Sequence, residues 1–202
     1  LVGSEMCIRD SHQHDAPAAD LTAAALLAQQ GIEQQLFDTP WFRAVVERAV
    51  LAVREAIATP QTVTHLAFGS GLIEQVASNR RILGPDGKVL HTRWTATKDV
   101  EVRAMPVGTI DPLVRSIAFW NDDTPLVATT YYATHPQSYY RTGLANPDFP
   151  GIARLARRTA TDTLHVHFNG AGGNIGAGKW NDGDHPDGDQ PAHAHRGGLG
   201  HR

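Results

Sequence analysis

The clearest fold signal in the chain is TPLVATTYYATHPQS, residues Thr124 to Ser138. Its first part is rich in β-branched and aromatic residues, which predicts a strand over 126–133, buried on both faces. The strand ends at Thr134-His135-Pro136, because proline lacks a backbone N–H and keeps the preceding residue extended. His135 is therefore expected at the end of a strand, where α/β sheets place their chemistry. The alternative is a histidine that only caps the strand by bonding a nearby carbonyl.

Outward from this strand, strand and helix patterns alternate. Residues 113–120 alternate as a strand does, and the turn 121–123 follows, so an antiparallel hairpin is expected. Pro150 is expected to open a helix that ends near Ala160, and 164–168 is a further strand. We therefore expect an α/β fold, a mixed β-sheet flanked by helices and incomplete at both ends.

Two helices are expected earlier in the chain. Residues 18–37 are rich in Ala, Leu and Gln, with Asp20 as a cap and Gly31 as an interruption. Thr39 is the expected N-cap of a second helix, which has Pro40 at its first position and runs to about residue 58. One face of this second helix is apolar, which predicts that it packs against the core.

Shorter strands are expected between these helices and the hairpin. Residues 62–69 have a strand pattern, which Gly69-Ser70-Gly71 would break. Residues 100–107 are the second such candidate.

The two ends of the chain differ from the rest. Residues 1–11 match the translation of a transposon-based sequencing adaptor, so we expect them to contribute nothing to the fold. They contain Cys7, the one cysteine, so we expect no disulfide, thiolate chemistry or cysteine-based zinc site elsewhere. Residues 12–183 are expected to be a fragment of a larger domain, and 184–202 a disordered or frame-shifted tail.

The overall charge gives no sign of a polyanionic partner. The chain has 18 basic and 21 acidic residues, so binding to nucleic acid is not expected. No apolar run approaches the roughly 20 residues that span a bilayer, so no transmembrane segment is expected.

Histidines form two close pairs. His12 and His14 would point to the same side of an extended segment, where they can serve one metal, or one metal and one substrate contact. His165 and His167 share a face of the strand 164–168 in the same way, but a structural role is the preferred explanation for them.

A glycine-rich loop, 169–178, follows the strand 164–168. Gly172 and Gly173 would let backbone N–H groups approach a bound oxyanion. The loop also approximates a phosphate-binding loop, but Trp180 stands where that motif needs Ser or Thr, and a turn follows in place of a helix. Nucleotide binding is therefore not expected.

Five short motifs, in this order, resemble those of the neutral/alkaline non-lysosomal ceramidase family, in its N-terminal catalytic domain. They are His12-Gln13-His14, Ser78-Asn79-Arg80, Ala133-Thr134-His135-Pro136, Asp148-Phe149-Pro150-Gly151 and the loop 169–177. The resemblance covers most of residues 12–183, which makes this segment a fragment of a ceramidase-like domain.

The resemblance implies a Zn²⁺-dependent amidase that cleaves the N-acyl bond of a small-molecule or lipid amide. By the same resemblance, His12 and His135 are zinc ligands, His14 is catalytic and contacts substrate and transition state, and Arg80 contacts substrate. It also implies a further glutamate and tyrosine ligand beyond this chain, and a secreted or periplasmic location.

One motif departs from the family. Its loop serine is Gly176 here, within a substrate-contacting stretch that includes Gly173 and Asn174. Hydrolysis would then depend on zinc-bound water, and the added space would suit a substrate other than ceramide. A catalytically silent binding protein of the same fold is the alternative.

Overall fold

The computed structural model describes residues 14–16, 19–33, 37–139 and 145–184. The chain divides into two compact units, one of residues Pro17–Thr62 and one of Leu1–Ala16 with Val63–Arg202. The expectations for residues 1–11, and for the tail beyond Asp184, lie outside the described residues.

The unit Pro17–Thr62 contains two helices. Helix α2, Leu21–Ala28, begins as expected at Asp20, whose carboxylate accepts a hydrogen bond from the N–H of Ala23 at 2.9 Å. The chain has left the helix before Gly31, whose φ of +74° is easily adopted by glycine.

Helix α3, Thr39–Ala58, ends where the sequence predicts, but the N-cap expected for it is wrong. Its N-cap is Asp38, which accepts from the N–H of Trp41 at 2.9 Å, so Thr39 lies inside the helix. No described side chain of α3 is buried, and Ile57 is 74% exposed. Its apolar face therefore does not pack into a core within this unit, and the expectation that it packs against the core of the chain stays a prediction.

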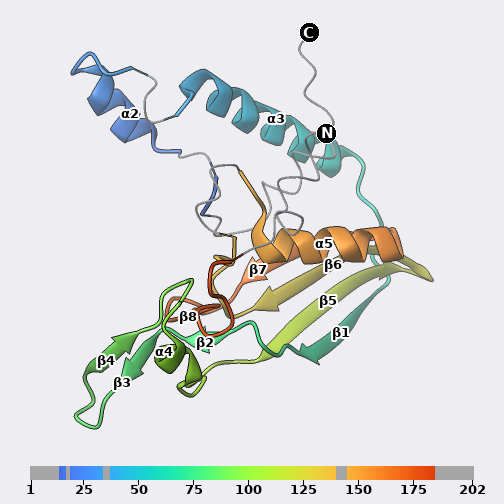
Figure 1. The fold of residues 1–202 in the computed structure, drawn as a ribbon. Coiled ribbons are helices and arrows are strands. Elements are labelled where there is room, and N and C mark those ends of the chain that lie inside the picture. Colours follow the sequence, from blue (N-terminus) through green and yellow to red (C-terminus); the bar gives the residue numbers. More distant parts are fainter. Residues whose placement is uncertain (1–13, 17–18, 34–36, 140–144, 185–202) are drawn as a thin grey trace. The chain divides into compact units, whose positions relative to one another are not determined.

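A mixed four-stranded sheet forms the frame of the second unit, in the order β1-β5-β6-β7 (Figure 1). The strands are β1 (His65–Leu72), β5 (Leu113–Asn121), β6 (Thr124–Tyr132) and β7 (Leu164–Asn169). β5 lies antiparallel to β1 and β6, whereas β6 and β7 are parallel. The predicted hairpin and the predicted α/β class are both confirmed.

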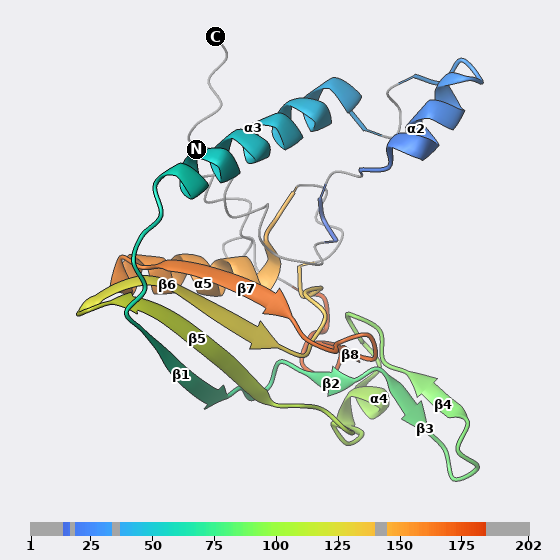
Figure 2. The same ribbon diagram turned by 180° about the vertical axis from the view of Figure 1, so that it is seen from behind.

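Helix α5, Asp148–Thr161, connects β6 to β7 and packs on one face of the sheet (Figures 1 and 2). It begins two residues before Pro150, the residue expected to open it. Since β6 and β7 are parallel, Tyr132 pairs with Asn169 and both strands end at the same edge. The loop with His135 and the glycine-rich loop therefore leave the sheet side by side.

Three local expectations are wrong. β1 continues through Gly69 and Gly71, and Gly69 suits this strand because a Cβ there would lie 3.0 Å from the Ser116 Oγ of β5. The expected strand 100–107 is instead helix α4, Val100–Ala104, because the Asp99 carboxylate caps its first turn. β6 is mostly half-buried rather than buried on both faces.

Two small sheets complete this unit. β2 (Ser78–Asn79) pairs with β8 (Ile175–Gly176), and β3 (Arg81–Leu83) pairs with β4 (Val89–Thr92). They lie with α4 at the end of the main sheet where β6 and β7 finish (Figure 2). In the described part of the chain, no helix has the length and apolarity needed to traverse a bilayer.

Candidate functional site

His135 lies three residues after β6, where two hydrogen bonds hold it to the glycine-rich loop. Its N–H donates to the carbonyl of Ile175 at 3.0 Å, and its ring Nδ1 lies 3.0 Å from the carbonyl oxygen of Gly172. A carbonyl oxygen can only accept, so Nδ1 carries the hydrogen. In the neutral ring, the lone pair is therefore on Nε2.

The close contact between the two loops requires glycine at position 172. A Cβ on Gly172 would lie 2.9–3.0 Å from three backbone atoms of Thr134, the residue before His135. The N–H of Gly172 donates to the carbonyl of Gly170 at 2.7 Å. The expectation that this N–H is directed at a bound oxyanion is therefore wrong. A Cβ on Gly173 would meet no atom within 4 Å, which leaves space at that position.

His14 lies beside His135, as the sequence predicts for a common site. Their ring centroids are 5.5 Å apart, with planes inclined at 41°. The side-chain nitrogen of Gln137 lies 2.9 Å from His14 Nδ1, while Thr95 Oγ1 donates to Gln137 Oε1 at 2.8 Å. An amide nitrogen can only donate, so His14 Nδ1 accepts and Nε2 carries the hydrogen.

The two rings therefore hold their hydrogens on opposite nitrogens. His135 offers a lone pair at Nε2, as a metal ligand requires, and His14 offers an N–H, as a proton donor requires. His12 lies outside the described residues, so its convergence with His135 stays a prediction. Within the described ranges, no three His, Cys, Asp or Glu side chains gather closely enough to hold a metal ion.

Arg80 and Asn174 connect the glycine-rich loop to β2 and β3. The N–H of Arg80 donates to the Asn174 carbonyl at 2.7 Å, and its exposed guanidinium stacks 4.9 Å from the centroid of the Trp94 ring. The Asn174 side chain accepts from Arg81 Nε at 2.7 Å and donates to Asn79. Asn174 thus holds the loop in place through its side chain, whereas Arg80 presents an exposed cation.

Gly176 pairs with Ser78 between β8 and β2. The Ser78 hydroxyl donates to the Gly176 carbonyl at 3.0 Å, which fixes the backbone there. A Cβ at Gly176 would meet no atom within 4 Å, so a serine would fit at this position.

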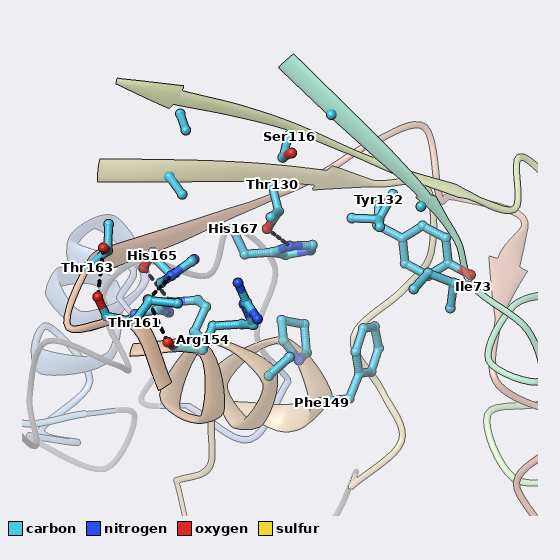
Figure 3. A pocket seen from close by; sticks show the side chains of 18 of the residues that line it. Ile73, Ser116, Thr130, Tyr132, Phe149, Arg154, Thr161, Thr163, His165 and His167 are labelled. Carbon is cyan, nitrogen blue, oxygen red and sulfur yellow. Dashed lines mark hydrogen bonds between the residues drawn. The ribbon is translucent and has the colours of Figure 1, made fainter. Parts of the chain in front are cut away.

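The second histidine pair, His165 and His167, faces a different region, a cavity of about 1000 Å³ between the sheet and α5 (Figure 3). His167 is buried and its Nδ1 lies 2.9 Å from Thr130 Oγ1. Burial, together with the Arg154 cation, lowers the pKa of His167 to about 4. His167 is therefore neutral at pH 7, and a mainly structural role remains the preferred explanation.

Several site residues were not found from the sequence. Gln137 and Thr95 fix the His14 ring through contacts distant in the chain, and no local pattern marks them. Arg93 is 2% exposed and donates to the carbonyls of Asn79, Val102, Met105 and Pro106, which ties α4 to β2. A single arginine between Thr92 and Trp94 gives no sequence signal for this role.

Solved structures that are similar to this chain include two of ceramidases. No protein-family model matches the chain, and no curated protein sequence matches it. The structure of neutral ceramidase from Pseudomonas aeruginosa matches 69% of this chain and 21% of its own, with 19% identity and a TM-score of 0.49. A ceramidase structure described as complexed with C2 matches 69% of this chain and 20% of its own, with 19% identity and a TM-score of 0.48. The match thus spans about a fifth of those chains.

Proposed function

We propose that the loops after β6 and β7 form part of the active site of a zinc-dependent amide hydrolase. His135 is the metal ligand and His14 is the catalytic proton donor. The observation that supports this most is a pair of ring contacts on two rings 5.5 Å apart: His135 Nδ1 lies on a carbonyl oxygen, whereas His14 Nδ1 lies on an amide nitrogen, which implies opposite hydrogen positions. A pair with identical roles would not need its two rings held in different tautomers.

The geometry of His135 fits zinc. Histidines that bind metals usually donate their other ring N–H to a carbonyl or carboxylate, which fixes the ring and directs the lone pair. The Gly172 carbonyl takes this role for His135. His12 is the second ligand in this proposal, and the resemblance implies a glutamate and a tyrosine further along. When bound, zinc would polarise the amide carbonyl and lower the pKa of a water molecule to about 7.

His14 would hold a proton at Nε2, next to the reacting amide. From there it can donate a hydrogen bond to the developing oxyanion, or a proton to the leaving nitrogen. Thr95 and Gln137 hold the proton at Nε2 rather than Nδ1, because the Gln137 amide nitrogen occupies Nδ1. Arg80, with its exposed guanidinium against Trp94, would contact a polar part of the substrate.

The space at Gly176 bears on the substrate. Packing does not exclude a side chain there, so the missing hydroxyl widens the region beside the β2–β8 pair. We propose a small-molecule or lipid amide, with ceramide as one member of that class. A catalytically silent binding protein is the second candidate, because Gly176 removes the loop hydroxyl.

Hydrolysis of a series of fluorogenic N-acyl amides tests this proposal. The longest form of the protein that contains this segment would be purified with zinc, as wild type, His135→Ala and His14→Ala. His135→Ala should lose both zinc and hydrolysis, while His14→Ala should keep zinc and lose about 100-fold or more in kcat. His65→Ala, on the exposed strand β1, is the matched control and should behave as wild type.

Two outcomes count against the proposal. A His135→Ala variant that keeps its zinc and its hydrolysis would exclude the assigned metal ligand. A wild type that binds the amides and never cleaves them would favour the silent binding protein.

A further inference from the structure

A buried carboxylate, Asp148, holds the loop that carries the His14 contact. Asp148 is 4% exposed, and its two oxygens accept from the N–H groups of Ser138 at 3.0 Å and Tyr139 at 2.9 Å. Oδ1 also accepts from the N–H of Phe149 at 2.7 Å. Ser138 directly follows Gln137, so Asp148 fixes the backbone next to the side chain that bonds His14.

Asn146, two residues before Asp148, holds the segment that contains His14 and Asp15. Its N–H donates to the Asp15 carbonyl at 3.0 Å, and its side-chain nitrogen donates to Asp15 Oδ2 at 3.4 Å and to the Tyr139 carbonyl at 2.9 Å. Its Oδ1 accepts from the N–H of Asp148 at 2.9 Å. Asp15 directly follows His14, so Asn146 fixes the segment on which His14 lies.

The backbone at this corner is strained. Asp148 has a φ of +51°, a left-handed conformation that residues other than glycine seldom adopt. Burial raises the pKa of Asp148, since the three N–H donors offset only part of the cost of desolvating a carboxylate near Asp15. The start of a helix requires neither a left-handed φ nor a buried carboxylate, because an exposed Asp or Ser would cap the helix as well.

We propose that Asp148 and Asn146 are positioning residues, which together set His14 at its distance and angle from His135. Asp148 holds the 137–139 loop, Asn146 holds the 14–15 segment, and a hydrogen bond joins the two. The catalytic importance of this role rests on the proposed function, but the positioning itself does not.

Histidine ring ¹⁵N NMR tests the positioning without zinc or substrate. In the wild type, the two ring nitrogens of His14 should have well-separated shifts, because one accepts and the other carries the hydrogen. In Asp148→Ala, His14 should lose at least about half of that separation, since a released ring exchanges between tautomers. His167, held by Thr130 in the main sheet, is the internal control and should be unchanged.

Two further variants keep the test decisive. Asp148→Asn retains an acceptor oxygen and should restore part of the His14 shift separation. Asn146→Ala should release the His14 ring as well. If Asp148→Ala fails to fold, Asn146→Ala is the variant that tests the proposal. An unchanged His14 ring in either alanine variant, with His167 intact, would overturn the proposal, whether or not the protein hydrolyses amides.

Discussion

Replacing Gly172 by alanine tests how tightly the two loops of the site fit together. The new methyl group would lie 2.9 Å from the carbonyl carbon of Thr134 and 3.0 Å from its Cα and N. These are backbone atoms, so neither partner can rotate away. Gly173→Ala is a matched control in the next position, because its methyl group would meet nothing within 4 Å.

The expected cost follows from these contacts. Inserting a methyl group into a packed region costs about 1–3 kcal/mol. Displacement of Thr134 also weakens the bond from His135 Nδ1 to the Gly172 carbonyl, worth about 1 kcal/mol. The entropy that alanine removes from the unfolded chain favours both variants equally, by about 0.4–1 kcal/mol. Gly172→Ala should therefore be less stable than Gly173→Ala by about 2–4 kcal/mol.

Urea unfolding of both variants measures this difference, with the ring ¹⁵N shifts of His135 as a local readout. Gly172→Ala should unfold at lower urea and show a changed His135 ring. Gly173→Ala should match or exceed the wild type. Equal unfolding midpoints for the two variants would refute the claim that close approach at Thr134 requires glycine.

Three further predictions concern the surrounding unit. Burial and the Arg154 cation lower the pKa of His167 to about 4, so the unfolded chain takes up the proton first as pH falls. The contribution of His167 to stability is complete above its unfolded pKa of about 6.5, and it should fall by about 3 kcal/mol by pH 4. A His167→Gln variant with the same pH profile in urea unfolding would contradict this. Arg93→Lys should lower the free energy of unfolding by about 2–4 kcal/mol, because lysine cannot reach all the carbonyls that Arg93 bonds. Arg80→Lys, at an exposed position, is the control and should lower it by about 1 kcal/mol or less. Equal losses for the two variants, in thermal or urea unfolding, would argue against the buried role of Arg93. Gly176→Ser should leave the free energy of unfolding within about 0.5 kcal/mol of the wild-type value, since a Cβ added at this position would have no atom within 4 Å. A larger loss would mean that this space is filled.

The part of the fold that local chemistry determines could be predicted from the sequence. The β-branched run and the turn at Asp122 gave the β5–β6 hairpin, and Pro136 marked the end of the strand before His135. Helix α4 was missed because the valines at its start favour a strand, while a single side chain, Asp99, caps the helix.

The supports of the candidate site could not be predicted in this way. Asn146 reaches Asp15 across 131 positions in the chain, and Gln137 reaches His14 across 123. Such contacts depend on how β6, α5 and β7 bring distant loops together at one sheet edge. No periodicity or local motif records that arrangement, although the histidines themselves stand out in the sequence.

Zinc binding by His135 is measured by a Zn²⁺ titration of the longest form of the protein that contains this segment, followed by the ring ¹⁵N shifts of each histidine. Residue-specific shifts separate the site from the histidines of the C-terminal tail. Zn²⁺ should move the Nε2 signal of His135 while its Nδ1 keeps its hydrogen, and His14 should keep its hydrogen on Nε2. A His135 ring that does not respond to Zn²⁺, or a His14 ring that loses its Nε2 hydrogen to the metal, would contradict this prediction.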